Sequence, residues 1–318
     1  MTPPTVPPLA LIRHPEADAA TRVRDHLRER FEVLSKAANR ARAGDDREAA
    51  HDVRVATRRL NSALRVWHDV LDADAVRATR RHLRRLRRRA GRLRDLEVQV
   101  EMLHARATEW AGEPRIAAEA LAARLERRLP RMAARTAQAA GKARMRRVER
   151  DLERALAPLR SSAPDASESP AQGAEHPPAI GPPDLASFAS TARHGLESAI
   201  ASGDDTQFHE ARIAVKRWRY AVEALEAVFP SPERAGSTSP LRGLQQALGA
   251  LQDIVTLRER VTRRAQRLRA QDRPAEADAL VAADAALAAE RSDAIAAIVE
   301  LVQRQPASDQ RRSTTPGA

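Results

Sequence analysis

Two stretches of the chain place a histidine ahead of regularly spaced basic residues, a combination suited to binding phosphate groups. The first reads HDVRVATRRL (51–60) and the second reads HEARIAVKRW (209–218). Arginine stays charged at physiological pH, and its planar guanidinium donates paired hydrogen bonds to phosphate oxygens. A histidine adds one N–H donor when neutral and two when charged. The chemistry indicated is therefore the recognition of an anion by several groups at once.

These stretches are part of a longer internal repeat. The offset between positions 51 and 209 also relates LRRL (83–86) to LRGL (241–244), and GRLRDL (91–96) to GALQDI (249–254). An ungapped register of this length indicates a tandem duplication that presents a His/Arg/Lys face twice.

The segments that must position these residues are predicted to be helical, because Ala, Leu, Arg and Glu dominate and are the strongest helix formers. Gly44-Asp45-Asp46 and Gly203-Asp204-Asp205 each predict a turn followed by a helix whose N-cap is an aspartate. The helices expected in the first half are 17–43, 46–71, 74–90, 92–111 and 114–157. Those expected in the second half are 184–202, 205–229, 239–250, 251–271 and 274–304.

At 100° per residue, both signature helices separate an apolar face from a basic face. In the first, the apolar face comprises Val53, Ala56, Leu60, Leu64 and Trp67, and the opposite face comprises His51, Arg54, Arg58, Ser62 and Arg65. In the second, the corresponding sets are Ala211, Ala214, Trp218, Val222, Leu225 and Phe229, and His209, Arg212, Lys216, Arg219 and Tyr220. Each helix is thus predicted to pack one face into a core and to present a basic stripe on the other.

The segment 77–94 holds ten arginines and no acidic residue. Arg77, Arg81, Arg84 and Arg88 share one helix face, where like charges repel by a few tenths of a kcal/mol per pair. A bound polyanion would remove this repulsion; the alternative interpretation is an ordinary solvated face. Asp95 and Asp253 recur at equivalent positions, and we expect them to support arginines or cap a helix.

Composition points to the same class of partner. The net charge is +12, with 55 basic and 43 acidic residues, which favours a polyanion: nucleic acid, an anionic membrane or polyphosphate. Genome composition is a sufficient explanation for the preference of Arg over Lys, but explains the clustering less well. With no cysteine and no apolar run of about 20 residues, the expected protein is soluble and cytoplasmic, without a membrane span or signal peptide.

Proline and serine content divides the chain. Residues 161–183 read as a Pro/Ser-rich linker between a first helical repeat (16–160) and a second (184–305). Residues 1–15 are expected to be a disordered leader and 306–318 a disordered tail. The sequence leaves the oligomeric state open.

The segments HDVRVATRRLNSAL, AGRLRDLEV, HEARIAVKRWRYAVE and LGALQDIV resemble the signatures of the CHAD domain, the conserved histidine α-helical domain. The resemblance implies an all-α fold of two pseudo-symmetric helix bundles around a basic cavity that binds inorganic polyphosphate. The binding residues it implies are His51, Arg54, Arg58, Arg59, His209, Arg212, Lys216, Arg217, Arg219 and Tyr220, with Arg84, Arg88 and Arg94 as additions from the following helix. The second copy carries Gly243, Gln245, Gln246 and Gln252 where the first has arginines, so the two halves should contribute unequally.

The function expected is non-catalytic binding of polyphosphate or a related polyanion, with association with polyphosphate granules as one consequence. A nucleic-acid-binding protein is the alternative, although Trp67 and Trp218 lie on core faces and leave few aromatic platforms for stacking bases. An enzyme is not expected, because the chain has no GxxxxGK[ST] loop, no HExxH motif and no acidic cluster near the basic stripes. No metal and no cofactor are predicted.

Overall fold

The computed structural model describes residues 15–44, 48–159, 180–182, 184–230 and 238–304. Over these residues it is all-α, as predicted, and no strand occurs among them. The described residues form ten α-helices and two short 3-10 helices, η1 and η2, in this order: α1 (Pro15–Ala43), α2 (Ala49–Val66), η1 (His68–Val70), α3 (Ala73–Glu109), α4 (Gly112–Glu126), α5 (Leu129–Ala139), α6 (Lys142–Ala155), η2 (Ala157–Leu159), α7 (Ala186–Ser202), α8 (Asp205–Val228), α9 (Thr238–Arg269) and α10 (Pro274–Gln303).

Two predicted helix breaks are wrong. The pairs 74–90 with 92–111, and 239–250 with 251–271, are the single helices α3 and α9. Gly91 lies inside α3, where a glycine costs about 1 kcal/mol relative to alanine. Leu86, Ala90 and Leu93 are nevertheless buried on both sides of it. The burial of this continuous apolar stripe outweighs the cost of one glycine.

The opposite error occurs at 114–157, which is α4, α5 and α6 rather than one helix. Pro130 lies in the first turn of α5, where its missing N–H is not needed, and Gly141 is the N-cap of α6. The two breaks allow α5 and α6 to turn back against α1 and α3. Pro130 was the available signal in an otherwise helix-favouring segment.

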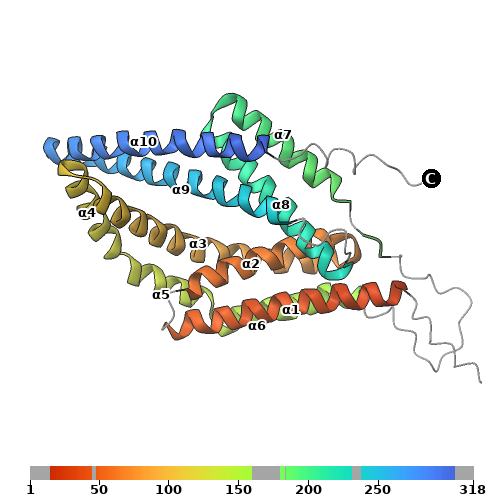
Figure 1. The fold of residues 1–318 in the computed structure, drawn as a ribbon. Coiled ribbons are helices and arrows are strands. Elements are labelled where there is room, and N and C mark those ends of the chain that lie inside the picture. Colours follow the sequence, from red (N-terminus) through yellow and green to blue (C-terminus); the bar gives the residue numbers. More distant parts are fainter. Residues whose placement is uncertain (1–14, 45–47, 160–179, 183, 231–237, 305–318) are drawn as a thin grey trace, which may run out of the picture.

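The two longest helices, α3 and α9, run through the molecule with few contacts to each other (Figure 1). They are joined instead through their neighbours: α2 packs on α8, and α4 packs on α10. The space between α3 and α9 is therefore bordered by one helix pair at each end, and this arrangement positions the candidate site.

Three clusters of buried side chains hold the helices together. The first cluster includes Leu60 and Leu86 with Val228 of α8; the second includes Leu103 of α3 with Leu257 of α9; the third includes Val215 and Leu248. The first two combine residues from both sides of the predicted linker. The pseudo-symmetry of the two repeats stays a prediction, and so do the domain boundaries; most of 1–15, 161–183 and 306–318 lies outside the described residues.

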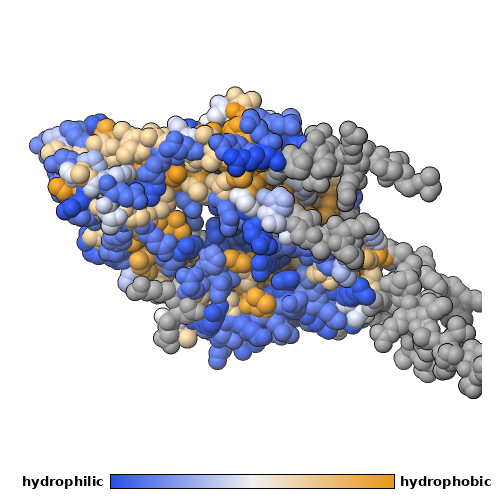
Figure 2. Space-filling view, in the orientation of Figure 1, coloured by the Kyte–Doolittle hydropathy of each residue, from blue (hydrophilic) through white to orange (hydrophobic). Residues whose placement is uncertain are grey.

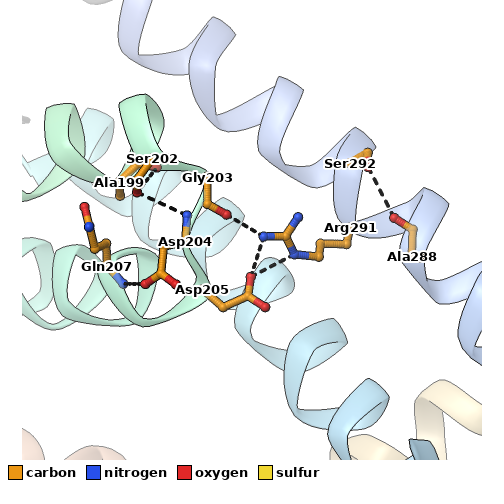
Figure 3. A network of polar contacts seen from close by, with 9 residues as sticks. All are labelled: Ala199, Ser202, Gly203, Asp204, Asp205, Gln207, Ala288, Arg291 and Ser292. Carbon is orange, nitrogen blue, oxygen red and sulfur yellow. Dashed lines mark hydrogen bonds and ion pairs between the residues drawn. The ribbon is translucent and has the colours of Figure 1, made fainter.

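The turn between α7 and α8 follows the prediction for its Gly-Asp-Asp sequence (Figure 3). Gly203 adopts a φ of 66°, which L side chains rarely adopt, and the Asp204 carboxylate accepts a hydrogen bond of 3.0 Å from the Gln207 N–H. Arg291 of α10 donates to the Asp205 carboxylate at 2.8 Å and to the Gly203 carbonyl at 2.6 Å. These bonds attach the start of α8 to α10. Asp45 and Asp46 lie outside the described residues, but the aspartate N-cap predicted for the helix that follows them is wrong, because α2 begins at Ala49 with Glu48 as its N-cap.

Over the described residues, no helix combines the length and apolar character needed to cross a membrane.

Candidate polyanion-binding site

The basic stripes of α2 and α8 converge with α3 on a first cavity of about 340 Å³. Its basic lining residues come from all three helices, and Phe188 of α7 contributes an apolar contact at its edge. They are Arg58, Arg65, Arg80, Arg84, Arg87, Lys216 and Arg217, accompanied by Asn61, Ser62 and Tyr220.

A second cavity of about 350 Å³ continues from the first between α3 and α9, and Arg58 and Arg87 line both. Its other polar lining residues are Arg54, Arg88, Arg92, Asp95, Gln99, His209, Arg212, Gln252, Asp253 and Thr256. Figure 2 shows an opening near the middle of the face of the molecule that it displays, and hydrophilic residues border this opening. We call the two joined spaces the central cavity.

Three arginines in the central cavity carry charge in a partly desolvated setting. Burial lowers the pKa values of Arg54, Arg58 and Arg212, and mutual proximity of the guanidinium groups lowers them further. A guanidinium does not deprotonate in a protein, so the lowered pKa expresses unfavourable free energy of the charged form. None of the three has a carboxylate within salt-bridge distance in the described chain, and Arg212 Nε is buried without a hydrogen-bond partner. An anion in the cavity would relieve this unfavourable free energy.

Lys216 is the most strongly perturbed of the basic residues. Its side chain is buried in α8, and burial, followed by repulsion from Arg212, Arg58 and Arg54, lowers its pKa from 10.5 to about 6. The amine of Lys216 therefore releases its proton more readily than that of an ordinary lysine. A negatively charged ligand beside it would raise its pKa and restore the charge.

Asp95 and Asp253 face the second part of the central cavity. Burial raises the pKa of Asp253, while Arg212 and Arg54 act to lower it. No arginine of the described chain lies within salt-bridge distance of either carboxylate, so the expected direct support of arginines is not formed. Their charges act on Arg54 and Arg212 across the cavity instead.

The structure brings nine of the predicted residues to the central cavity and places four elsewhere. The nine are Arg54, Arg58, Arg84, Arg88, His209, Arg212, Lys216, Arg217 and Tyr220. Arg94 pairs with Glu97 and Glu101, at 3.8 and 3.2 Å. Arg59 lies 3.9 Å from Glu223, and His51 is half-buried with a buried, unpartnered Nδ1.

Arg219, the fourth of these residues, supports the cavity rather than lining it. It is buried, donates to Gln245 at 2.8 Å and to Glu223 at 2.5 Å, and stacks 4.5 Å from the centre of the Tyr220 ring. These contacts fix the orientation of Tyr220, which does line the cavity. The helical wheel placed Arg219 on the basic face, but α8 packs against α1, α2, α7 and α9, so Arg219 is buried although His209 on the same face is exposed.

The candidate binding residues taken from the sequence do not include Arg65, Arg80, Arg87 and Arg92, which also line the central cavity. The arginine run in 77–94 is too dense to show which side of α3 faces α2. A usable signal was spacing, because Arg80, Arg84, Arg87, Gly91 and Asp95 recur every three or four residues and all line the central cavity. Gln252 also belongs to the site and hydrogen-bonds His209. In the part of the chain that the structure describes, no group of three or more His, Cys, Asp or Glu side chains is arranged to hold a metal ion.

Comparison with known proteins identifies the family. The CHAD domain model matches residues 25–262, well over half of the chain, and the chain therefore belongs to the CHAD domain family. No curated protein matches the sequence.

Two solved structures share the fold. PptA from Streptomyces chartreusis superposes with a TM-score of 0.65 at 21% sequence identity, covering 90% of this chain and 99% of its own. The CHAD domain from the plant Ricinus communis superposes with a TM-score of 0.63 at 22% identity, covering 94% of this chain and 96% of its own. At these identities the likeness concerns the fold.

Proposed function

We propose that this protein binds inorganic polyphosphate in the central cavity without catalysing a reaction on it. The observation that carries the proposal is the convergence of Arg54, Arg58 and Arg212 in a partly buried space where no carboxylate of the described residues forms a salt bridge with them. Membership of the CHAD domain family supports it, because the family resemblance implies this ligand. Association with polyphosphate granules in the cytoplasm is part of the same proposal.

The physical reason is multivalent neutralisation. Each phosphate unit of the chain carries about one negative charge, and several guanidinium groups can each donate paired hydrogen bonds to its oxygens. Binding also releases counterions, which adds a favourable term that weakens as salt increases. The cavity needs no base-reading or stacking groups for such a ligand.

The first test is titration of long-chain polyphosphate against the wild type and an Arg54/Arg58/Arg212/Lys216→Ala variant at physiological salt. We expect an affinity loss of at least roughly a hundredfold, because several charge-assisted hydrogen bonds are removed together. The matched control removes four exposed arginines outside the cavity, as Arg146/Arg147/Arg193/Arg242→Ala. Circular dichroism verifies that each variant is helical.

Equal binding by the wild type and the cavity variant would contradict the proposal, and so would an equal loss in the control. Duplex DNA is added as a competitor: ready displacement of polyphosphate by DNA would favour the nucleic-acid alternative. Phosphate release measured with and without Mg²⁺ tests the non-catalytic part. Sustained release by the wild type, absent from the cavity variant, would show that the cavity is an active site.

A further inference from the structure

The arginine-lined space continues beyond the central cavity, toward the far ends of α3 and α9. A third cavity of about 340 Å³ shares Arg92, Asp95, Gln99 and Thr256 with the central cavity. Its additional lining residues come from α3, the α4–α5 turn, α5 and α9, and they are Leu96, Arg128, Met132, Arg135 and Arg260. The shared residues show that the two spaces adjoin.

A fourth cavity, of about 270 Å³, follows between α4 and α9. It shares Arg128 and Arg260 with the third cavity, and six of its eight lining residues are arginines. We call these six the outer arginine cluster: Arg124, Arg128, Arg260, Arg263, Arg264 and Arg267. Leu121 and Leu125 complete its lining and belong to the second hydrophobic core.

Helix geometry explains why these arginines line up with the central cavity. On α9 the lining residues Gln252, Thr256, Arg260, Arg264 and Arg267 recur every three or four residues, so they share one face of one helix. At a rise of 1.5 Å per residue, Thr256 and Arg267 lie about 16 Å apart along the helix axis. The cluster therefore extends the basic surface by a distance comparable to three turns of helix.

The charges of the outer arginine cluster are largely uncompensated. Arg263 pairs with Glu259 at 3.2 Å, but within the described ranges no carboxylate lies within salt-bridge distance of the other five. Arg260 Nε is buried without a hydrogen-bond partner, and burial followed by repulsion from Arg128 lowers the Arg260 pKa.

Arginines elsewhere on α9 show that acidic partners are available nearby. Arg258 pairs with Asp284 at 3.0 Å, and Arg269 pairs with Asp278 at 3.0 Å. Both carboxylates belong to α10, which packs on α9 and contributes no lining residue to the third or fourth cavity. The two acids thus pair with Arg258 and Arg269 and not with the arginines of the outer arginine cluster.

From this arrangement we propose that the outer arginine cluster is a second binding region for the same polyphosphate chain, and that it makes the protein selective for long chains. This inference rests on the proposed function. A short chain occupies the central cavity alone, whereas a long chain reaches along α9 to the outer arginine cluster. Because the second contact is then intramolecular, modest individual interactions raise the overall affinity.

The test compares tripolyphosphate with long-chain polyphosphate on the full protein. The outer variant is Arg124→Ala/Arg264→Ala/Arg267→Ala, whose three positions do not line the central cavity. The control is Arg146→Ala/Arg193→Ala/Arg242→Ala, which removes the same charge from exposed helix positions. We expect the outer variant to lose roughly tenfold in affinity for the long chain and to keep its affinity for tripolyphosphate. The control should lose much less for either ligand.

Unchanged long-chain affinity in the outer variant would overturn this inference and leave the proposed function intact. An equal loss for both ligands, or an equal loss in the control, would also overturn it, because the cluster would then act only as general positive charge. The central-cavity variant Arg54/Arg58/Arg212/Lys216→Ala decides the proposed function separately. If that variant binds tripolyphosphate as the wild type does, the proposed function fails whatever the outer variant shows.

Discussion

Lys216 shows how one residue couples ligand binding to pH. Its pKa of about 6 lies far below the value of 10.5 for an unperturbed lysine. Between these two pH values the unfolded chain binds more protons than the folded chain, so the contribution of Lys216 to the free energy of unfolding rises with pH across this window. A bound polyanion favours the charged amine, so it raises the pKa of Lys216 again.

We therefore expect polyphosphate binding to take up protons through Lys216, and to tighten as the pH falls from about 8 to about 6. Calorimetric titration in two buffers of different ionisation enthalpy measures the uptake. Lys216→Met should remove it. Lys142→Met, at an exposed position, should not. The same proton uptake in Lys216→Met as in the wild type would assign the protons to the ligand or to another group.

At the scale of the element, α9 and the α7–α8 turn use glycine in opposite ways. Gly249 lies inside α9 with helical backbone, and a Cβ built there meets no atom within 4 Å. Gly203 ends α7 with a φ of 66°, a conformation that costs an L side chain about 1 kcal/mol or more. Glycine is thus required at the turn but not within the helix.

Gly249→Ala should raise the free energy of unfolding by about 0.5–1 kcal/mol, because alanine lowers the backbone entropy of the unfolded chain. Gly203→Ala should lower it by about 1 kcal/mol. Chemical denaturation of the two variants beside the wild type gives both values. Stabilisation by Gly203→Ala would mean that the left-handed turn in Figure 3 is not maintained in solution.

At the scale of the whole molecule, the hydrophobic cores do not separate at the predicted linker. Leu257 of α9 is fully buried among residues of α3 and α4, and Val228 of α8 is buried among residues of α1, α2 and α6. Each tryptophan reports on a different cluster, because Trp67 belongs to the first, Trp110 packs on the second and Trp218 packs on the third. The chain therefore carries its own probes of cooperativity.

We expect the three clusters to unfold together. Three variants would each retain one tryptophan and carry phenylalanine at the other two positions. In each variant, the urea midpoint of the tryptophan signal should coincide with the midpoint of the far-UV signal. Leu257→Ala should shift all three midpoints, since truncating a buried leucine costs about 2–5 kcal/mol. A shift confined to the Trp110 signal would instead show that the cores unfold independently.

The sequence by itself determined the all-α class, the Gly203 turn with its Asp204 cap, and eight of the twelve basic residues that line the central cavity. Local propensity and helical periodicity carry that information, because one helix presents residues three and four apart on a single face. The same rules predict a helix break at Gly91, where buried leucines continue on both sides, and they miss the break before Pro130.

Only the tertiary structure decided which basic residues share a cavity and which are paired. The sequence gives Arg94 and Arg219 the same chemistry as Arg54, but carboxylates at short distance engage the first two and leave Arg54 facing the cavity. The tertiary structure also aligns the outer arginine cluster with the central cavity, through the packing of α4 beside α9. Contacts between residues so far apart in the chain depend on how helices pack, which the pattern within any one helix does not specify.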